Sequence, residues 1–76
     1  MNQAQDFGIG DRVWWYYDNS QKSKNSGVVE EIEGDLMNIW EDWVTECHVS
    51  IVALRTERGW LVHRPYEGYK ELLYKD

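Results

Sequence analysis

Cysteine is nearly absent from this sequence, since Cys47 is the only one among 76 residues. A single cysteine cannot form an intrachain disulfide, and it cannot supply the set of thiolates that holds a structural zinc ion. Small secreted domains usually depend on disulfides for stability. We therefore expect this chain to work in a reducing compartment, the cytoplasm.

Two further absences concern export and membranes. The first residues contain no basic segment followed by an apolar run, so the sequence predicts no signal peptide. No apolar stretch approaches the roughly 20 residues that a membrane-spanning helix needs. We expect a soluble protein with no membrane partner, in which residues 1–8 form a flexible leader and residues 9–76 form one small β-barrel domain.

Basic residues are missing from the middle of the chain. The whole sequence has 8 lysines and arginines against 14 aspartates and glutamates, a net charge of −6. Residues 25–50 contain no lysine or arginine, and their carboxylates are Glu30, Glu31, Glu33, Asp35, Glu41, Asp42 and Glu46. Binding to nucleic-acid phosphates needs a basic face, so this distribution disfavours nucleic acid and favours a protein partner with a basic patch.

The sequence also lacks the residue spacings that mark catalytic and metal sites. Cys47 and His48 are neighbours, and neighbouring side chains in a strand point to opposite faces, so they do not form a nucleophile–base pair. His63 would reach Cys47 only if the two strands that carry them were aligned. The chain has no CxxC or HxxxH pair for zinc, no EF-hand loop and no glycine-rich phosphate loop after a strand. We expect neither an enzyme nor a metal or cofactor site.

Aromatic residues, by contrast, are abundant, with five tryptophans and five tyrosines. Four of them are consecutive, from Trp14 to Tyr17, in a segment rich in strand-forming residues. If Trp15 and Tyr17 face the core, then Trp14 and Tyr16 lie outside. They are then covered by another element, such as residues 36–46, or by a second copy of the chain, or they form an exposed patch of the kind that marks an interface.

Turn-forming residues divide the chain into short strands. Residues 18–27 are uniformly polar and predict a flexible surface loop, after which Gly27 opens the next strand. The glycine within residues 33–35 predicts a tight turn. Pro65 should end a strand, because proline cannot donate a hydrogen bond to a ladder. The expected strands are residues 12–18, 28–33, 36–40, 43–54, 60–63 and 70–74.

One segment supports two interpretations. Apolar side chains recur at helical spacing from Leu36 to Cys47, and Asp35 is a suitable N-cap, so a short helix at residues 36–46 is an alternative. The strand interpretation is favoured because isoleucine, tryptophan, valine and threonine predominate there, and because residues 41–42 can form a turn.

The order of these elements is similar to that of known small β-barrels. The matching positions lie in or directly before the predicted strands, namely Gly10, Asp11, Val13, Gly27, Val29, Ile32 and Gly59, with the closing segment KELL. On these positions the chain resembles Tudor, KOW and related SH3-like domains. The resemblance implies a mostly-β fold, a small SH3-like open barrel of five to six strands. Members of these families bind peptides, methylated side chains or nucleic acids on one barrel face, so the resemblance alone does not choose a function.

These observations predict a small acidic module for protein–protein interaction, an adaptor or an inhibitor without catalysis. Exposed aromatic side chains are the expected anchors, and nearby carboxylates are expected to steer a basic partner. The candidate residues are Trp14, Tyr16, Trp40 and Trp43 as anchors, and Glu41, Asp42 and Glu46 as steering charges.

Three alternatives stay open. The acidic middle resembles the phosphate array of nucleic acid, which small inhibitors encoded by phages and mobile elements mimic in order to block a nucleic-acid-binding protein. A nucleic-acid-binding barrel would use Arg55, Arg58 and Arg64, which cluster near one predicted hairpin. A homodimer would cover the second aromatic face with a twin subunit.

Overall fold

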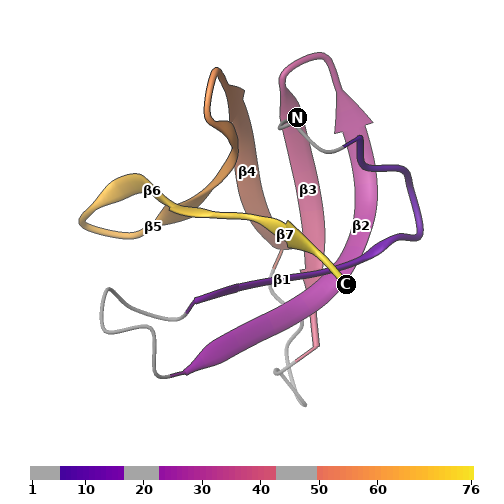
Figure 1. Cartoon of the computed structure of the whole chain (residues 1–76), viewed down its shortest axis with the longest axis horizontal. Helices are drawn as coiled ribbons and strands as arrows, with labels where there is room; N and C mark the ends of the chain where they lie inside the picture. Colours follow the sequence, from indigo (N-terminus) through magenta and orange to yellow (C-terminus); the bar gives the residue numbers. More distant parts are fainter. Residues whose placement is uncertain (1–5, 17–22, 43–49) are drawn as a thin grey trace.

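A computed structural model describes residues 6–16, 23–42 and 50–76, and in these ranges every regular element is a β-strand (Figure 1). The strands are β1 Arg12–Tyr16, β2 Lys24–Glu33, β3 Leu36–Glu41, β4 Ser50–Thr56, β5 Gly59–Arg64, β6 Gly68–Leu72 and β7 Tyr74–Lys75. The mostly-β prediction is confirmed. The described ranges contain no helix that could cross a membrane.

The seven strands form one antiparallel sheet that nearly closes on itself. Their order is β6-β5-β4-β3-β2-β1-β7, so β6 and β7 lie at opposite edges, and yet only Leu73 separates them in the chain. The last segment therefore runs from β5 to β1 and closes the barrel, as the yellow ribbon in Figure 1 shows. The Leu73 N–H donates to the Trp60 carbonyl, and the Asp76 N–H donates to the Arg12 carbonyl. This small barrel is compatible with an SH3-like fold.

The core is built from alternate residues of each strand, as the two-residue period of a strand requires. Val13 and Trp15 of β1 are buried, and Trp14 and Tyr16 between and beyond them are not. The buried cluster comprises Val13, Trp15, Val29, Met37, Ile39, Ala53, Trp60, Val62 and Leu73. The predicted inward face of the first strand is confirmed at Trp15, and Tyr17 lies outside the described residues.

The second strand begins earlier than its composition suggests. Residues 24–27, which we expected in a polar loop, belong to β2, where Lys24 pairs with Tyr16 and Asn25 with Trp15. That prediction was wrong because the ladder with β1 outweighs the turn preference of single polar residues. Gly27 has a packing role inside the strand, since a Cβ there would lie 2.5 Å from the Trp40 carbonyl oxygen.

Residues 36–41 form β3, which pairs with β2 on one side and with β4 on the other. The helical alternative is therefore wrong over this range, and its remainder to residue 46 lies outside the described residues. Two ladders satisfy the backbone of β3, and the strand period places both Met37 and Ile39 in the core. The turn before β3 is formed as expected, with Gly34 at φ 63°.

The later strands differ from the expectations mainly at their ends. β4 begins at Ser50 and continues to Thr56, and the expected beginning of that strand, residues 43–49, lies outside the described residues. β5 ends at Arg64, directly before Pro65, as predicted. The single last strand expected at residues 70–74 is two strands, β6 and β7, because its residues change partner from β5 to β1.

Candidate interaction surface

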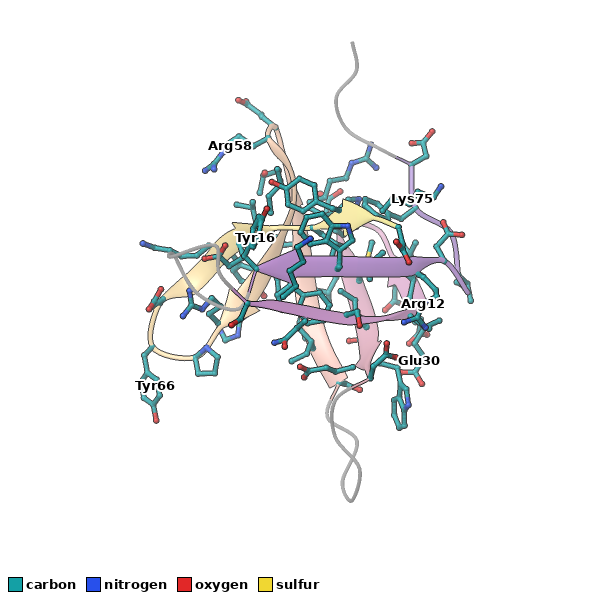
Figure 2. All side chains as sticks on the ribbon, turned by 60° about the horizontal axis from the view of Figure 1, so that its bottom comes forward. Arg12, Tyr16, Glu30, Arg58, Tyr66 and Lys75 are labelled. Atoms are coloured by element: carbon teal, nitrogen blue, oxygen red, sulfur yellow. The ribbon has the colours of Figure 1, made fainter. Side chains whose placement is uncertain are left out.

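Three aromatic rings gather on the outside of the barrel, over β1 and β7. The rings of Trp14 and Tyr74 are stacked, with centroids 4.4 Å apart and planes 18° apart. Tyr16 meets both edge-on, at 5.2 Å from Trp14 and 6.1 Å from Tyr74. All three side chains are half-buried, so the chain covers them only in part. We call Trp14, Tyr16 and Tyr74 the aromatic cluster; Figure 2 labels Tyr16 beside β1.

The register of the sheet explains why these rings meet. Trp14 pairs with Tyr74 of β7 on one side, and directly opposed residues of an antiparallel pair share a face. On the other side Lys24 of β2 is opposite Tyr16, and its Nζ lies 4.4 Å from the centre of the Trp14 ring, a cation–π contact. Among the described residues, Tyr74 of β7 and Lys24 of β2 thus cover Trp14 in part. Residues 43–46 of the segment expected as a cover, residues 36–46, lie outside the described residues.

An ion pair lies next to the aromatic cluster on the same face. The Arg12 guanidinium donates a hydrogen bond to the Asp42 carboxylate, which also accepts one from the Ser26 hydroxyl at 2.9 Å. The Asp42 N–H donates to the Ser26 carbonyl, so Asp42 continues the β2–β3 pairing. Its bond to Arg12, followed by that to Ser26, holds the pKa of the Asp42 carboxyl below its usual range. Asp42 is thus engaged within the chain.

Trp40 belongs to the same outer face. It pairs with Val28 of β2, and Val28 pairs with Arg12 of β1, so the three side chains lie in one row across the sheet. The side chain of Trp40 is 38% exposed. The structure thus brings Trp14, Tyr16, Trp40 and Asp42 onto one surface, which we call the outer face.

Glu41 lies on the opposite side of the sheet. It pairs with Gly27, an inward position, and helps to line a hollow of about 350 Å³ at one end of the barrel, beside Trp15 and Val62. Among the described residues no cation pairs with Glu41. Burial raises the pKa of its carboxyl, and the nearby charge of Asp42 raises it further. Glu41 is therefore not placed to act with Trp14, and both Trp43 and Glu46 lie outside the described residues.

Exposed carboxylates gather where β2 turns into β3. Glu30, Glu31, Glu33 and Asp35 are all exposed. Of these, Glu31 accepts a long hydrogen bond from the Asn38 amide, at 3.5 Å. This acidic hairpin continues the outer face beyond Trp40, because Glu31 and Glu33 fall on the same side of the sheet as Trp40.

The three arginines considered for nucleic-acid binding all lie in the β4–β5 hairpin, but Arg64 lies apart from Arg58. Arg58 lies in the β4–β5 turn, directly before β5, whereas Arg64 is the last residue of β5 (Figure 2 labels Arg58). Arg64 is held by Glu71 at 3.1 Å and by Glu67 at 3.3 Å. A strand rises about 3.3 Å per residue, so β5 separates these arginines by its full length.

Two members of this surface could not be identified from the sequence. Tyr74 and Lys24 belong to it because of their register against β1. β7, which carries Tyr74, has only two residues, and Lys24 begins β2 within a polar segment. Neither segment shows a hydrophobic period that predicts a strand. Alternation along the chain did identify Trp14 and Tyr16 as outward residues.

Comparison of the chain with models of protein families, with curated proteins and with solved structures found no match.

Proposed function

We propose that this protein is a small cytoplasmic protein-interaction module, a barrel of the Tudor or KOW type that binds a partner protein through its outer face. The observation that carries the proposal is the aromatic cluster, three stacked and edge-on rings that remain half-exposed outside the core. Tryptophan and tyrosine supply large contact areas at little cost in side-chain entropy, and they are the usual anchors of protein interfaces.

The charges around the cluster favour a basic partner. Arg12 is neutralised by Asp42, whereas the acidic hairpin beyond Trp40 is exposed. A basic patch on the partner would be drawn to the hairpin while aromatic contacts form beside it. We propose binding without catalysis; the described His63 is exposed and lies edge-on against Tyr69, with ring centroids 4.9 Å apart.

The first experiment is affinity capture with the immobilised protein, read by quantitative mass spectrometry. The test variants are Trp14→Ser and Trp40→Ser, and the control is Tyr69→Ser, an aromatic residue of β6 that is 37% exposed and outside the outer face. We expect the test variants to lose a protein that the control retains. Binding of that protein, once purified, should weaken about tenfold or more for either variant, as at an interface hot spot. Equal capture by all three variants would contradict the proposal.

Absolute mass from light scattering, over a wide range of protein concentrations, separates a foreign partner from a twin subunit. We expect a monomer throughout. A dimer that Trp14→Ser converts to monomer would assign the aromatic cluster to self-association instead.

The exposed carboxylates of the acidic hairpin favour a second candidate, an inhibitor that mimics nucleic-acid charge. An inhibitor of this kind should bind its partner much more weakly as the salt concentration rises, and DNA or RNA should displace it from the partner. Replacing Glu30, Glu31 and Glu33 by lysine would then abolish binding, and Trp14→Ser would have little effect. The aromatic module instead predicts a large loss of binding with Trp14→Ser, so this variant separates the two candidates.

A further inference from the structure

The outer face is hollowed beside Trp40. The hollow has a volume of about 450 Å³ and is lined by Ile9, Gly10, Val28, Val29, Glu30 and Trp40. Ile9 is 70% exposed and Trp40 38% exposed, so two large apolar side chains border it in contact with water. Exposed apolar surface of this kind usually marks a contact site. We call it the Trp40 hollow.

One wall of the hollow is a turn that is bound to β2. The Gly10 N–H donates to the Val29 carbonyl at 2.8 Å, and the Val29 N–H donates to the Asp11 carbonyl at 2.9 Å. The Asp11 carboxylate accepts a hydrogen bond from the Gly8 N–H at 2.7 Å, which closes the turn. These bonds hold Ile9 at the rim, so the wall exists before any ligand arrives.

The lining of the hollow includes one charged residue, Glu30, which lies at a β-bulge. The β2–β3 register shifts between Val29 and Glu31, so Glu30 is the extra residue of the bulge. Bulges redirect a side chain out of the regular alternation and often do so at functional sites. Glu30 is exposed, and among the described residues no cation pairs with it. Figure 2 shows Glu30 and Arg12 on the same side of the molecule.

We propose that the Trp40 hollow binds an arginine side chain of the partner protein. The lining combines one aromatic side chain, aliphatic side chains and a single carboxylate, and these match the flat cation, alkyl stem and hydrogen-bond donors of arginine. Arg12 does not fill this role, because its guanidinium is bound to Asp42. The inference rests on the proposed function and names the chemistry of the partner at one part of the outer face.

The test is a titration of the whole protein, labelled with ¹⁵N, with n-butylguanidinium as the probe. The neutral n-butylurea has the same shape and serves as the matched ligand. We expect saturable shifts of the Ile9 and Glu30 amides and of the Trp40 indole N–H, with weaker binding of n-butylurea. Glu30→Gln should weaken binding of the cation about tenfold, as expected on losing a charge-assisted hydrogen bond.

Glu33→Gln is the control variant, because Glu33 is an exposed carboxylate of the same strand that does not line the hollow. It should bind the probe like the unchanged protein. The inference is overturned if Glu30→Gln and Glu33→Gln bind equally, or if the shifts do not saturate. Ile9→Ser, at a 70% exposed position, is a second variant that should weaken binding without affecting folding.

The titration needs no partner, so the two proposals fail separately. Saturable binding at the hollow together with capture that is insensitive to Trp14→Ser would overturn the proposed function and leave the arginine site standing. Loss of capture with Trp14→Ser, together with no probe binding at the hollow, would overturn the arginine site and leave the proposed function standing.

Discussion

The indole of Trp14 in β1 stacks on the phenol ring of Tyr74 in β7, with ring centroids 4.4 Å apart. β7 has only two residues, and its pairing with β1 closes the barrel. A contact on the outer surface thus helps to hold the seam of the fold. The same two rings therefore serve both the stability of the barrel and the proposed interface.

The stacked pair should contribute measurably to stability. We expect Trp14→Ala and Tyr74→Ala each to lower the free energy of unfolding by about 1–3 kcal/mol. The double variant should lose about 0.5–1.5 kcal/mol less than the sum, because either single change already removes the stacking. Urea denaturation measures all three. Tyr66→Ala, at a fully exposed tyrosine, is the control, and strictly additive losses would show that the rings do not interact.

The Arg12–Asp42 ion pair should make stability depend on pH. The native-state pKa of Asp42 lies below that of the unfolded chain, so its stabilisation is complete above the unfolded-state pKa and is lost as the pH falls through the native-state value. Asp42→Asn should cost about 0.2–1 kcal/mol at neutral pH, since the pair is partly exposed, and nothing in acid. Thermal melts from pH 2 to pH 7 check this, with Asp35→Asn as the control. An equal cost at every pH would contradict the assignment.

Glu41 should show the opposite dependence. Burial and the charge of Asp42 raise its native-state pKa above the unfolded-state value, so ionised Glu41 destabilises the barrel. The penalty is absent in acid, grows as the pH rises from the unfolded-state pKa through the native-state value, and is constant above it. Glu41→Gln should therefore raise the melting temperature at neutral pH and leave it unchanged in acid. Glu33→Gln is the control, and a destabilising Glu41→Gln at neutral pH would refute the prediction.

Gly27 should tolerate no side chain. A Cβ there would lie 2.5 Å from the Trp40 carbonyl oxygen and 2.9 Å from Ile39 Cγ2, so Gly27→Ala must force β2 and β3 apart. We expect a loss of about 1–3 kcal/mol or more, typical of overpacking. Gly8→Ala is the matched control, because its Cβ would meet only the Asp11 carboxylate at 3.6 Å. Similar unfolding free energies for the two variants would show that the strands can separate without cost.

The candidate site was only partly predictable. Trp14 and Tyr16 followed from alternation alone, because the strand period separates them from the buried Val13 and Trp15. Glu41, Asp42 and Glu46 were expected to act together as steering charges, but Glu41 and Asp42 lie on opposite sides of the sheet. A turn at residues 41–42, or a helix over residues 36–46, could have placed these carboxylates on one side. Local spacing alone did not decide between those two structures.

The sequence by itself determined the fold class, most strand positions and the inward face of the first strand. These properties depend on local signals: the two-residue period, the turn at Gly34 and the strand end before Pro65. Only the tertiary structure decided that Tyr74 and Lys24 meet Trp14, that β2 begins at Lys24, and that Glu30 is a bulge residue. Register and barrel closure depend on the summed energy of ladders between distant segments, which no single stretch of the chain encodes.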